Sequence, residues 1–147
     1  MPDALLELAI SEARRTVDKT PRKERKDLGQ FVTPAPIARF MARRLVRDID
    51  TGLVTILDPA AGTGVLAAAV LDEILACDDA PKLVQLVLYE IDPRLVGSLR
   101  ILAARIKDAA RHRGIAVSTS IRNKDFLLCG DVVRQRLPAD IVISNPP

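Results

Sequence analysis

The sequence has little of what several large classes of protein require. Its two cysteines, Cys77 and Cys129, are too few for a disulfide framework and lack the paired spacing of a zinc site. The only histidine, His112, stands between two arginines at an expected helix end, where the helix dipole favours a cation. Metal binding and catalysis by Ser-His-Asp or Cys-His groups are therefore not expected.

Long apolar segments and aromatic residues are also scarce. No apolar run reaches the roughly 20 residues of a membrane-spanning helix, and the first residues lack the basic and then apolar layout of a secretory signal. We therefore expect a cytoplasmic protein with no membrane partner. Aromatic residues make up 3% of the chain, so base stacking by this stretch alone is not expected, and the net charge of +3 permits nucleic-acid binding without arguing strongly for it.

The remaining composition is that of a compact globular domain. A chain of 147 residues with 48% hydrophobic and 28% charged residues can bury a sizeable core. An amphipathic helix is predicted at residues 4–19 and ends before Pro21, and a mixed charge run follows at residues 22–27. This run is interpreted as a solvated linker, with contact to phosphate groups as the alternative. We divide the chain into an N-terminal helix and linker, residues 1–28, and a domain of residues 29–147.

From residue 35 onward, apolar strands alternate with helices. Strands are predicted at residues 53–57, 83–89, 115–119 or slightly beyond, and 140–144. Helices are predicted at residues 35–49, from 65 to about 76, 93–111 and, shorter, 130–136. This alternation predicts an α/β fold with a mostly parallel sheet and helices on both faces. The helix at 35–49 is expected to pack into the core through a stripe of Ile37, Phe40, Met41, Leu45 and Val46.

A glycine-containing turn, Asp58 to Gly64, lies between the first strand and the next helix. Gly62 and Gly64 allow positive φ and close approach of a ligand to the backbone, and a helix N-terminus favours an anionic group. The spacing also satisfies the dinucleotide-binding fingerprint, with Glu90 ending the next strand where an acid holds ribose hydroxyls. These features fit any nucleotide or S-adenosylmethionine binder. A tight turn that serves only helix packing would carry the same glycines.

Asp125 and Phe126 follow the third strand. A carboxylate and an aromatic ring at this position can hydrogen-bond an adenine amino group and stack on its ring. The alternative is a turn-forming aspartate and a core phenylalanine. Taken alone, the pair favours this alternative.

The most specific stretch is Asn145-Pro146-Pro147, which ends the last strand. Pro146 pushes Asn145 toward extended geometry and is itself restricted by Pro147. The result is a stiff platform that presents the Asn145 side-chain oxygen and the Pro146 carbonyl in the same direction. Two such acceptors bind the N–H groups of an exocyclic amine and favour its pyramidal, nucleophilic form beside a sulfonium methyl. Alone, the tripeptide is typical of a loop, but its position after the glycine turn and the strand-end acid favours catalysis.

Together these motifs resemble the amino-methyltransferases that modify adenine N6 in DNA, over nearly the whole chain from Gly29 to Pro147. The resemblance implies a Rossmann-like S-adenosylmethionine-dependent methyltransferase fold that is incomplete at its C-terminus. It implies a site for S-adenosylmethionine at the turn after the first strand. One segment of this site contacts the methionine part of the cofactor, and acidic and aromatic side chains hold its ribose and adenine. The residues with these implied roles are Phe31, Thr33 and Pro34; Asp58, Ala60, Gly62 and Gly64; Glu90 and Ile91; and Asp125 and Phe126. Ala61 stands where Cys or Gly is common in the family, and Asn145, Pro146 and Pro147 are implied to hold the target adenine.

The resemblance further implies a site-specific DNA methyltransferase of a restriction-modification system that acts on double-stranded DNA with a flipped adenine. In the family, an aromatic residue follows the second proline and stacks on the flipped base. A later recognition domain supplies the DNA contacts that offset the cost of flipping. Because both are absent here, we expect the chain to bind S-adenosylmethionine weakly and not to methylate DNA by itself.

Other functions remain open. A methyltransferase acting on a protein glutamine or an RNA base amine would use the same Asn-Pro-Pro platform. A nicotinamide-dependent oxidoreductase would share the glycine turn and Glu90, but it gives no role to Thr33-Pro34 or to Asn145-Pro146-Pro147. A non-catalytic cofactor-binding or partner-binding fragment would use the exposed last strand as an edge for pairing.

Overall fold

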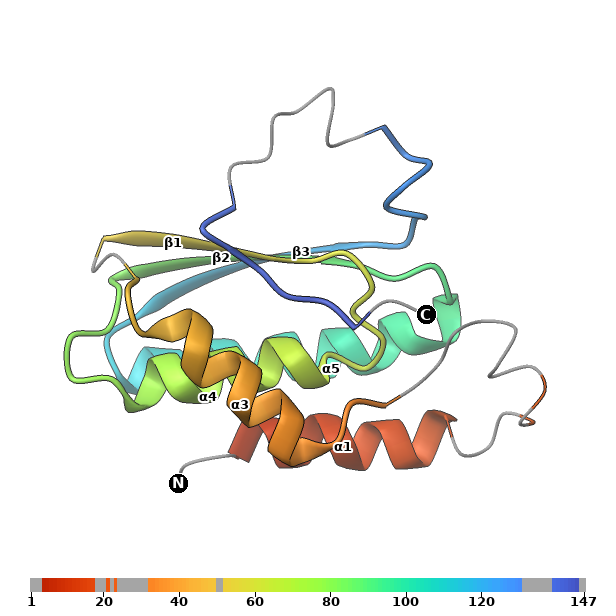
Figure 1. The fold of residues 1–147 in the computed structure, drawn as a ribbon, viewed down its shortest axis with the longest axis horizontal. Helices are drawn as coiled ribbons and strands as arrows, with labels where there is room; N and C mark the ends of the chain where they lie inside the picture. Colours follow the sequence, from red (N-terminus) through yellow and green to blue (C-terminus); the bar gives the residue numbers. More distant parts are fainter. Residues whose placement is uncertain are drawn as a thin grey trace.

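The computed structural model describes residues 4–17, 21, 23, 32–49, 52–130 and 139–145. Within these ranges a four-stranded sheet of order β3-β2-β1-β4 packs against helices (Figure 1). The strands are β1 Leu53–Asp58, β2 Leu83–Tyr89, β3 Ala116–Arg122 and β4 Ile141–Val142. The helices are α1 Ala4–Val17, α3 Ala35–Val46, α4 Val65–Ala76 and α5 Pro93–His112. Each strand pairs in parallel with its neighbour, so the predicted α/β fold with a parallel sheet is confirmed.

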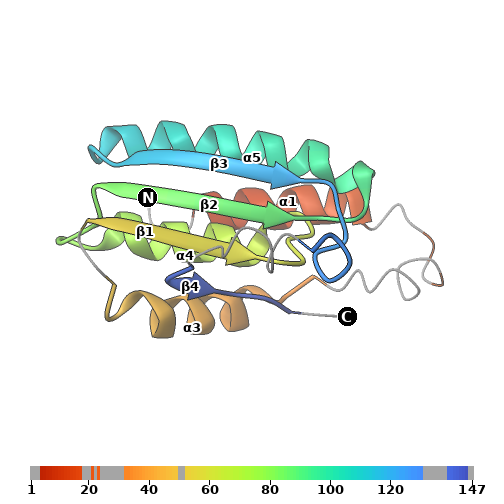
Figure 2. The ribbon, with the colours of Figure 1, turned by 90° about the horizontal axis from the view of Figure 1, so that it is seen from above.

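Helices were predicted on both faces of the sheet, but those of the described ranges lie on one face, as the two perpendicular views agree (Figures 1 and 2). On the opposite face, Phe126, Cys129 and Ala139 pack against Leu57 and its neighbours on β2. The short helix expected at residues 130–136 lies, apart from Gly130, outside the described residues.

The core lies between the sheet and the helices. Alternate residues of the two central strands, including Val54, Ile56, Leu86 and Leu88, are buried on this side, as expected where successive side chains point to opposite faces. Helix α4 is buried along most of its length and is rich in alanine. Its small side chains allow α1 and α3 to approach it closely, and both helices contact it extensively.

Helix α1 is part of this core. Leu6 and Ala9 are fully buried, and the backbone N–H groups of Leu5 and Leu6 donate to the Asp72 carboxylate of α4 at 3.2 and 2.8 Å. These bonds satisfy donors that the first turn of a helix leaves without partners. The N-terminal helix therefore contributes to the structure of the domain.

The stripe expected on α3 is partly wrong. Ile37 is 51% exposed and Phe40 is 67% exposed, whereas Ala38, Ala42 and Val46 are buried. The alanines lie one turn apart, and their small side chains allow α3 to pack closely on α4, which it contacts extensively. Met41 and Leu45 do pack against the core in part. Helix α3 also ends at Val46 rather than near residue 49, β3 extends to Arg122, and β4 keeps only two paired residues.

None of the helices in the described ranges has the length and apolar character needed to cross a membrane.

Candidate functional site

The residues predicted to be functional gather at one edge of the sheet. The parallel strands run in the same direction, so their carboxyl ends meet at this edge (Figure 2). Asp58 ends β1, Glu90 follows β2, Asp125 follows β3 and Asn145 follows β4. Ligands of open α/β sheets bind at such edges.

The glycine turn after β1 uses its two glycines differently. Gly64 is the N-cap residue of α4 and has φ of 85°; a Cβ atom there would lie 2.4 Å from Leu102 Cδ2, so its absence allows α5 to pack closely. Gly62 has φ of 58°, but a Cβ atom there would face open space. Gly64 is therefore required by packing, whereas Gly62 leaves the backbone accessible at the edge of the sheet.

The Glu90 carboxylate connects this turn to the end of β2. One oxygen, Oε2, accepts from the backbone N–H of Gly62 at 2.7 Å, and Oε1 accepts from that of Asp92 at 2.8 Å. Glu90 is 7% exposed, and this burial raises the pKa of its carboxyl. Each carboxylate oxygen has a second lone pair, so Glu90 can hold the turn and still accept from a ligand hydroxyl.

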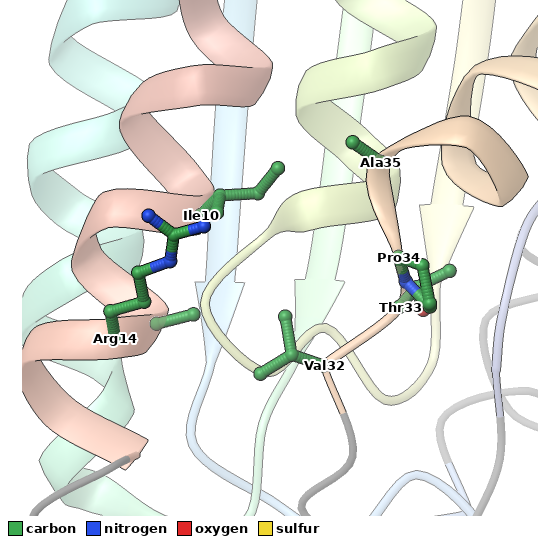
Figure 3. A pocket seen from close by; sticks show the side chains of 7 residues that line it. Ile10, Arg14, Val32, Thr33, Pro34 and Ala35 are labelled. Carbon is green, nitrogen blue, oxygen red and sulfur yellow. The ribbon is translucent and has the colours of Figure 1, made fainter.

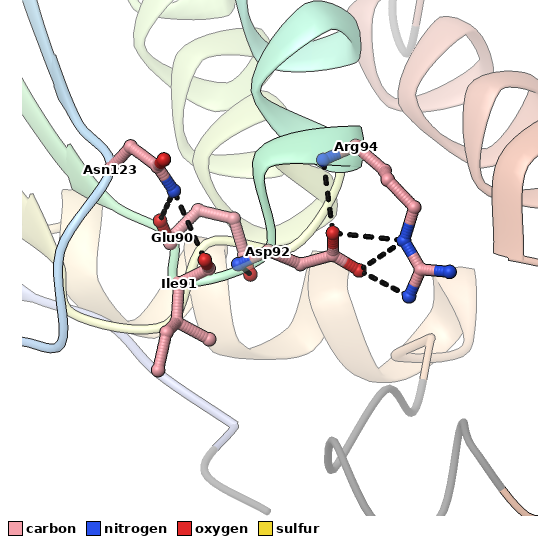
Figure 4. Close-up of polar contacts among 5 residues, drawn as sticks. All are labelled: Glu90, Ile91, Asp92, Arg94 and Asn123. Atoms are coloured by element: carbon pink, nitrogen blue, oxygen red, sulfur yellow. Dashed lines mark hydrogen bonds and ion pairs between the residues drawn. The ribbon is translucent and has the colours of Figure 1, made fainter.

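Two residues that the sequence reasoning did not single out fix the segment after β2 (Figure 4). Asn123 Nδ2 donates to the backbone carbonyls of Glu90 and Ile91 at 2.8 and 3.1 Å. Asp92 caps α5 by accepting from the backbone N–H of Arg94 at 2.9 Å, and it pairs with the Arg94 guanidinium at 2.8 Å. The sequence signal for Asp92 was its position before Pro93 at a helix start. For Asn123 the signal was only an amide side chain at a strand end.

Asp58 has one partly satisfied and one unsatisfied carboxylate oxygen. Oδ1 accepts from the backbone N–H of Ala60 at 3.1 Å, whereas Oδ2 is buried with no hydrogen-bond partner among the described residues. Burial raises the pKa of this carboxyl to about 7. A buried acceptor without a partner is costly in free energy. The site therefore favours a cationic or hydrogen-bonding ligand group beside Asp58.

The predicted adenine-binding residues have structural roles as well. Asp125 Oδ1 accepts from the backbone N–H groups of Leu127 and Leu128 at 2.8 and 3.2 Å, so this aspartate forms a turn. The ring of Phe126 meets that of Tyr89 edge to face at a centroid distance of 4.9 Å. Ile91 is 57% exposed and offers an apolar surface at the strand ends. A role of Asp125 and Phe126 toward adenine stays a prediction.

A cavity of about 360 Å³ lies beside the glycine turn, between α1 and the segment before α3 (Figure 3). Its lining residues are Ile10, Ala13, Arg14, Val32, Thr33, Pro34 and Ala35. Thr33 and Pro34 were predicted to bind a cofactor, whereas α1 was not expected to contribute. Arg14 is the charged residue of this lining, and it makes no ion pair with a described residue. Phe31 lies outside the described residues.

Asn145 lies near this cavity in the folded chain. Its side-chain Nδ2 donates to Thr33 Oγ1 at 3.3 Å, across 112 positions of sequence. The strand before it is held by Asp140, whose carboxylate accepts from the backbone N–H of Thr55 at 2.7 Å, and by Ile143, whose N–H donates to Leu57. Pro146 and Pro147 were predicted to act together with Asn145. Both lie outside the described residues.

The described part of the chain contains no cluster of side chains that could hold a metal ion. Cys77 and Cys129 are both free thiols.

Comparisons with known proteins agree with this arrangement. A solved structure from Listeria monocytogenes, of a protein assigned to the class I S-adenosylmethionine-dependent methyltransferases, matches with a TM-score of 0.63 and 22% identity. The match covers 96% of this chain and 38% of that protein, so this chain spans well under half of its length. At this identity the likeness shows the fold. No curated protein sequence matches the chain significantly.

The sequence model of the N-6 DNA methylase family matches residues 16–147, which is most of the chain and includes the turn, the strand-end acid and the Asn-Pro-Pro motif. The chain therefore belongs to the N-6 DNA methylase family, whose methyl donor is S-adenosylmethionine.

Proposed function

We propose that this chain provides the cofactor-binding and catalytic part of a site-specific DNA methyltransferase that transfers a methyl group to adenine N6. The observation that supports this most directly is the position of Asn145. It follows β4, it is exposed, and it lies at the edge of the sheet where Asp58 ends β1 and Glu90 follows β2. Membership of the family and the methyltransferase fold are consistent with this activity.

The residues at this edge fit S-adenosylmethionine. The unsatisfied Oδ2 of Asp58 offers an acceptor to a positively charged group. Glu90 can accept from the ribose hydroxyls, and the exposed side chain of Ile91 can cover an adenine ring. Arg14, in the cavity beside Thr33, offers a cation to the carboxylate of the methionine part. When bound, the cofactor supplies a methyl group activated by a positively charged sulfur.

Asn145 acts on the target amine. Its side-chain oxygen accepts one N–H of the exocyclic amine, holds the nitrogen in place and favours the geometry in which the lone pair is directed at the methyl group. The bound cofactor would supply a methyl group that exchanges its C–S bond, whose electron pair would stay with sulfur, for a bond to this nitrogen. The methylated nitrogen then loses a proton to water, so no strong base is needed in the protein.

The proposed partner is double-stranded DNA with its adenine flipped out of the stack, since the amine cannot reach a strand-end site inside a duplex. We further propose that methylation falls on one recognition sequence within a restriction-modification system in the cytoplasm. Sequencing methylated genomic DNA tests this: modification scattered over many unrelated sequences would oppose it.

The activity is tested with the full-length protein and radiolabelled S-adenosylmethionine. We expect label in an adenine-containing duplex and none in the same duplex already methylated at N6. Asn145→Ala should lower the rate by about 100-fold, as loss of a preorganised hydrogen-bonding group does in other active sites.

Two other outcomes would oppose this proposal. Label in RNA or in a glutamine peptide, but not in DNA, would favour a methyltransferase that acts on RNA or on protein glutamine. S-adenosylhomocysteine binding without methylation of any substrate would favour a non-catalytic fragment.

A further inference from the structure

A hydrogen bond joins the side chains of Thr33 and Asn145, which lie far apart in the sequence. Thr33 is 6% exposed, whereas Asn145 is exposed. The bond runs from Nδ2 of Asn145 to Oγ1 of Thr33 at 3.3 Å. The nitrogen and oxygen of the amide leave its carbon in different directions, so donation through the nitrogen turns the oxygen of Asn145 away from Thr33. This oxygen makes no hydrogen bond to a described residue.

An asparagine side chain does not keep such an orientation unaided. Its terminal torsion is broad and nearly two-fold, so an amide without partners turns readily. A turned amide would present N–H donors to the target amine, which also carries N–H donors. Two donors facing each other cannot bond, so the rate depends on which end of the amide faces the substrate.

Thr33 is well placed to hold this amide. The following Pro34 has φ of −58° and restricts Thr33 to extended geometry. The carbonyl of Pro34 accepts from the N–H groups of Ile37 and Ala38, both at 3.0 Å, so Thr33 is anchored at the start of α3. The same residue lines the cavity between α1 and α3.

We propose that Thr33 is a positioning residue, whose hydrogen bond holds the Asn145 side chain at the edge of the sheet where the target amine is expected. This inference rests on the proposed methyltransferase function. It assigns Thr33 a role in the rate of methyl transfer, in addition to any contact with the cofactor. One residue thereby joins the cavity predicted to receive the methionine part to the residue predicted to bind the substrate.

The first test compares Thr33→Val, which keeps the side-chain shape and removes the hydroxyl, with Thr33→Ser, which keeps the hydroxyl. In the full-length protein we expect Thr33→Val to lower kcat at least about tenfold, the effect of losing roughly 1.4 kcal/mol in the transition state. The affinity for S-adenosylhomocysteine, measured by calorimetry, should change less than about threefold, and Thr33→Ser should retain most of the activity. An unchanged kcat for Thr33→Val, or a loss of affinity as large as the loss of rate, would overturn the inference.

The second test needs no methylation. The side-chain amide signals of Asn145 in a proton–nitrogen NMR spectrum are assigned by their loss in Asn145→Asp. We expect Thr33→Val to shift them toward the values of a solvated amide and Thr33→Ser to leave them near those of the wild type. Signals that do not move in a folded Thr33→Val variant would overturn the inference. If the wild type methylates no substrate while these signals respond as expected, the proposed function is wrong but the hydrogen bond between Thr33 and Asn145 is confirmed.

Discussion

The Glu90 carboxylate accepts a 2.7 Å hydrogen bond from the backbone N–H of Gly62, 28 positions earlier in the chain. This bond joins the glycine turn after β1 to the segment after β2. The other oxygen of Glu90 accepts from Asp92. One buried side chain therefore fixes the relative position of two segments that are both predicted to touch the cofactor.

Glu90→Ala should lower both stability and cofactor affinity. The N–H groups of Gly62 and Asp92 would lose their acceptor, and for the buried N–H of Asp92 this costs about 1–3 kcal/mol. Glu90→Gln keeps one oxygen and should be intermediate in melting temperature. Both variants should weaken S-adenosylhomocysteine binding at least about tenfold, because the ribose hydroxyls lose a charged acceptor. Circular dichroism and calorimetric titration measure the two effects.

Glu73→Gln provides a matched control for Glu90. Glu73 forms an ion pair with Arg43 at 3.0 Å on the outer side of α4. Such exposed pairs contribute about 0–1 kcal/mol, so this variant should melt and bind nearly as the wild type does. Wild-type affinity in a folded Glu90→Ala variant would show that the ribose assignment is wrong.

Asp58→Asn should change how stability depends on pH. Burial raises the pKa of Asp58 from 3.8 to about 7, so the folded protein binds this proton more tightly than the unfolded chain. The resulting stabilisation is complete below pH 3.8 and is lost as the pH rises through 7. Between pH 5 and 7 the wild type should therefore lose about 2 kcal/mol of unfolding free energy relative to Asp58→Asn. Urea denaturation of both proteins at several pH values measures this difference.

The comparison between the two proteins cancels the titration of groups that do not interact with Asp58, which leaves Glu90 as the coupled group, because its charge adds to the effect of burial on the pKa of Asp58. Asp108→Asn, which alters an exposed residue of α5, serves as the control and should show no such trend. A difference between wild type and Asp58→Asn that is constant from pH 5 to 8 would mean that Asp58 is ionised in the folded state.

Gly64→Ala and Gly62→Ala should separate stability from binding. Both residues have positive φ, where an L side chain costs roughly 1–2 kcal/mol. At Gly64 the new methyl group would also overlap Leu102, which adds about 1–3 kcal/mol. Gly62 faces open space, so Gly62→Ala should unfold nearer to the wild-type temperature but bind S-adenosylhomocysteine more weakly. Equal losses of stability in the two variants would contradict this division of roles.

The fold was largely predictable because its signals are local. The alternation of apolar strands with helices and the glycine turn gave β1, α4, β2 and α5 within one or two residues of their observed bounds. The inner face of α3 was not predictable in this way. The spacing of large apolar residues predicted that Ile37 and Phe40 would be buried, but the buried residues include the small Ala38 and Ala42. The contact of α3 with α4 joins two helices that are separate in the sequence, so it could not be predicted from the local pattern.

The candidate site was predictable where a motif marks a strand end. Asp58, Glu90 and Asn145 were found because each follows an apolar strand in a parallel sheet. Arg14 and Asn123 were missed because their positions depend on packing. Arg14 reaches the site only because α1 docks beside the glycine turn, where the Thr63 hydroxyl donates to the carbonyl of Ala9 at 3.3 Å.

Arg14→Gln tests whether α1 contributes to the cofactor site. If Arg14 holds the carboxylate of the methionine part, the variant should bind S-adenosylhomocysteine at least about tenfold more weakly, since a charged hydrogen bond contributes roughly 1.5–3 kcal/mol. Methylthioadenosine lacks the amino-acid part, so its affinity should stay within about twofold of the wild-type value. Arg44→Gln, an exposed change on α3 away from the cavity lining, should affect neither ligand. Equal weakening of both ligands by Arg14→Gln would mean that Arg14 supports the shape of the site, because only contact with the carboxylate can discriminate between them.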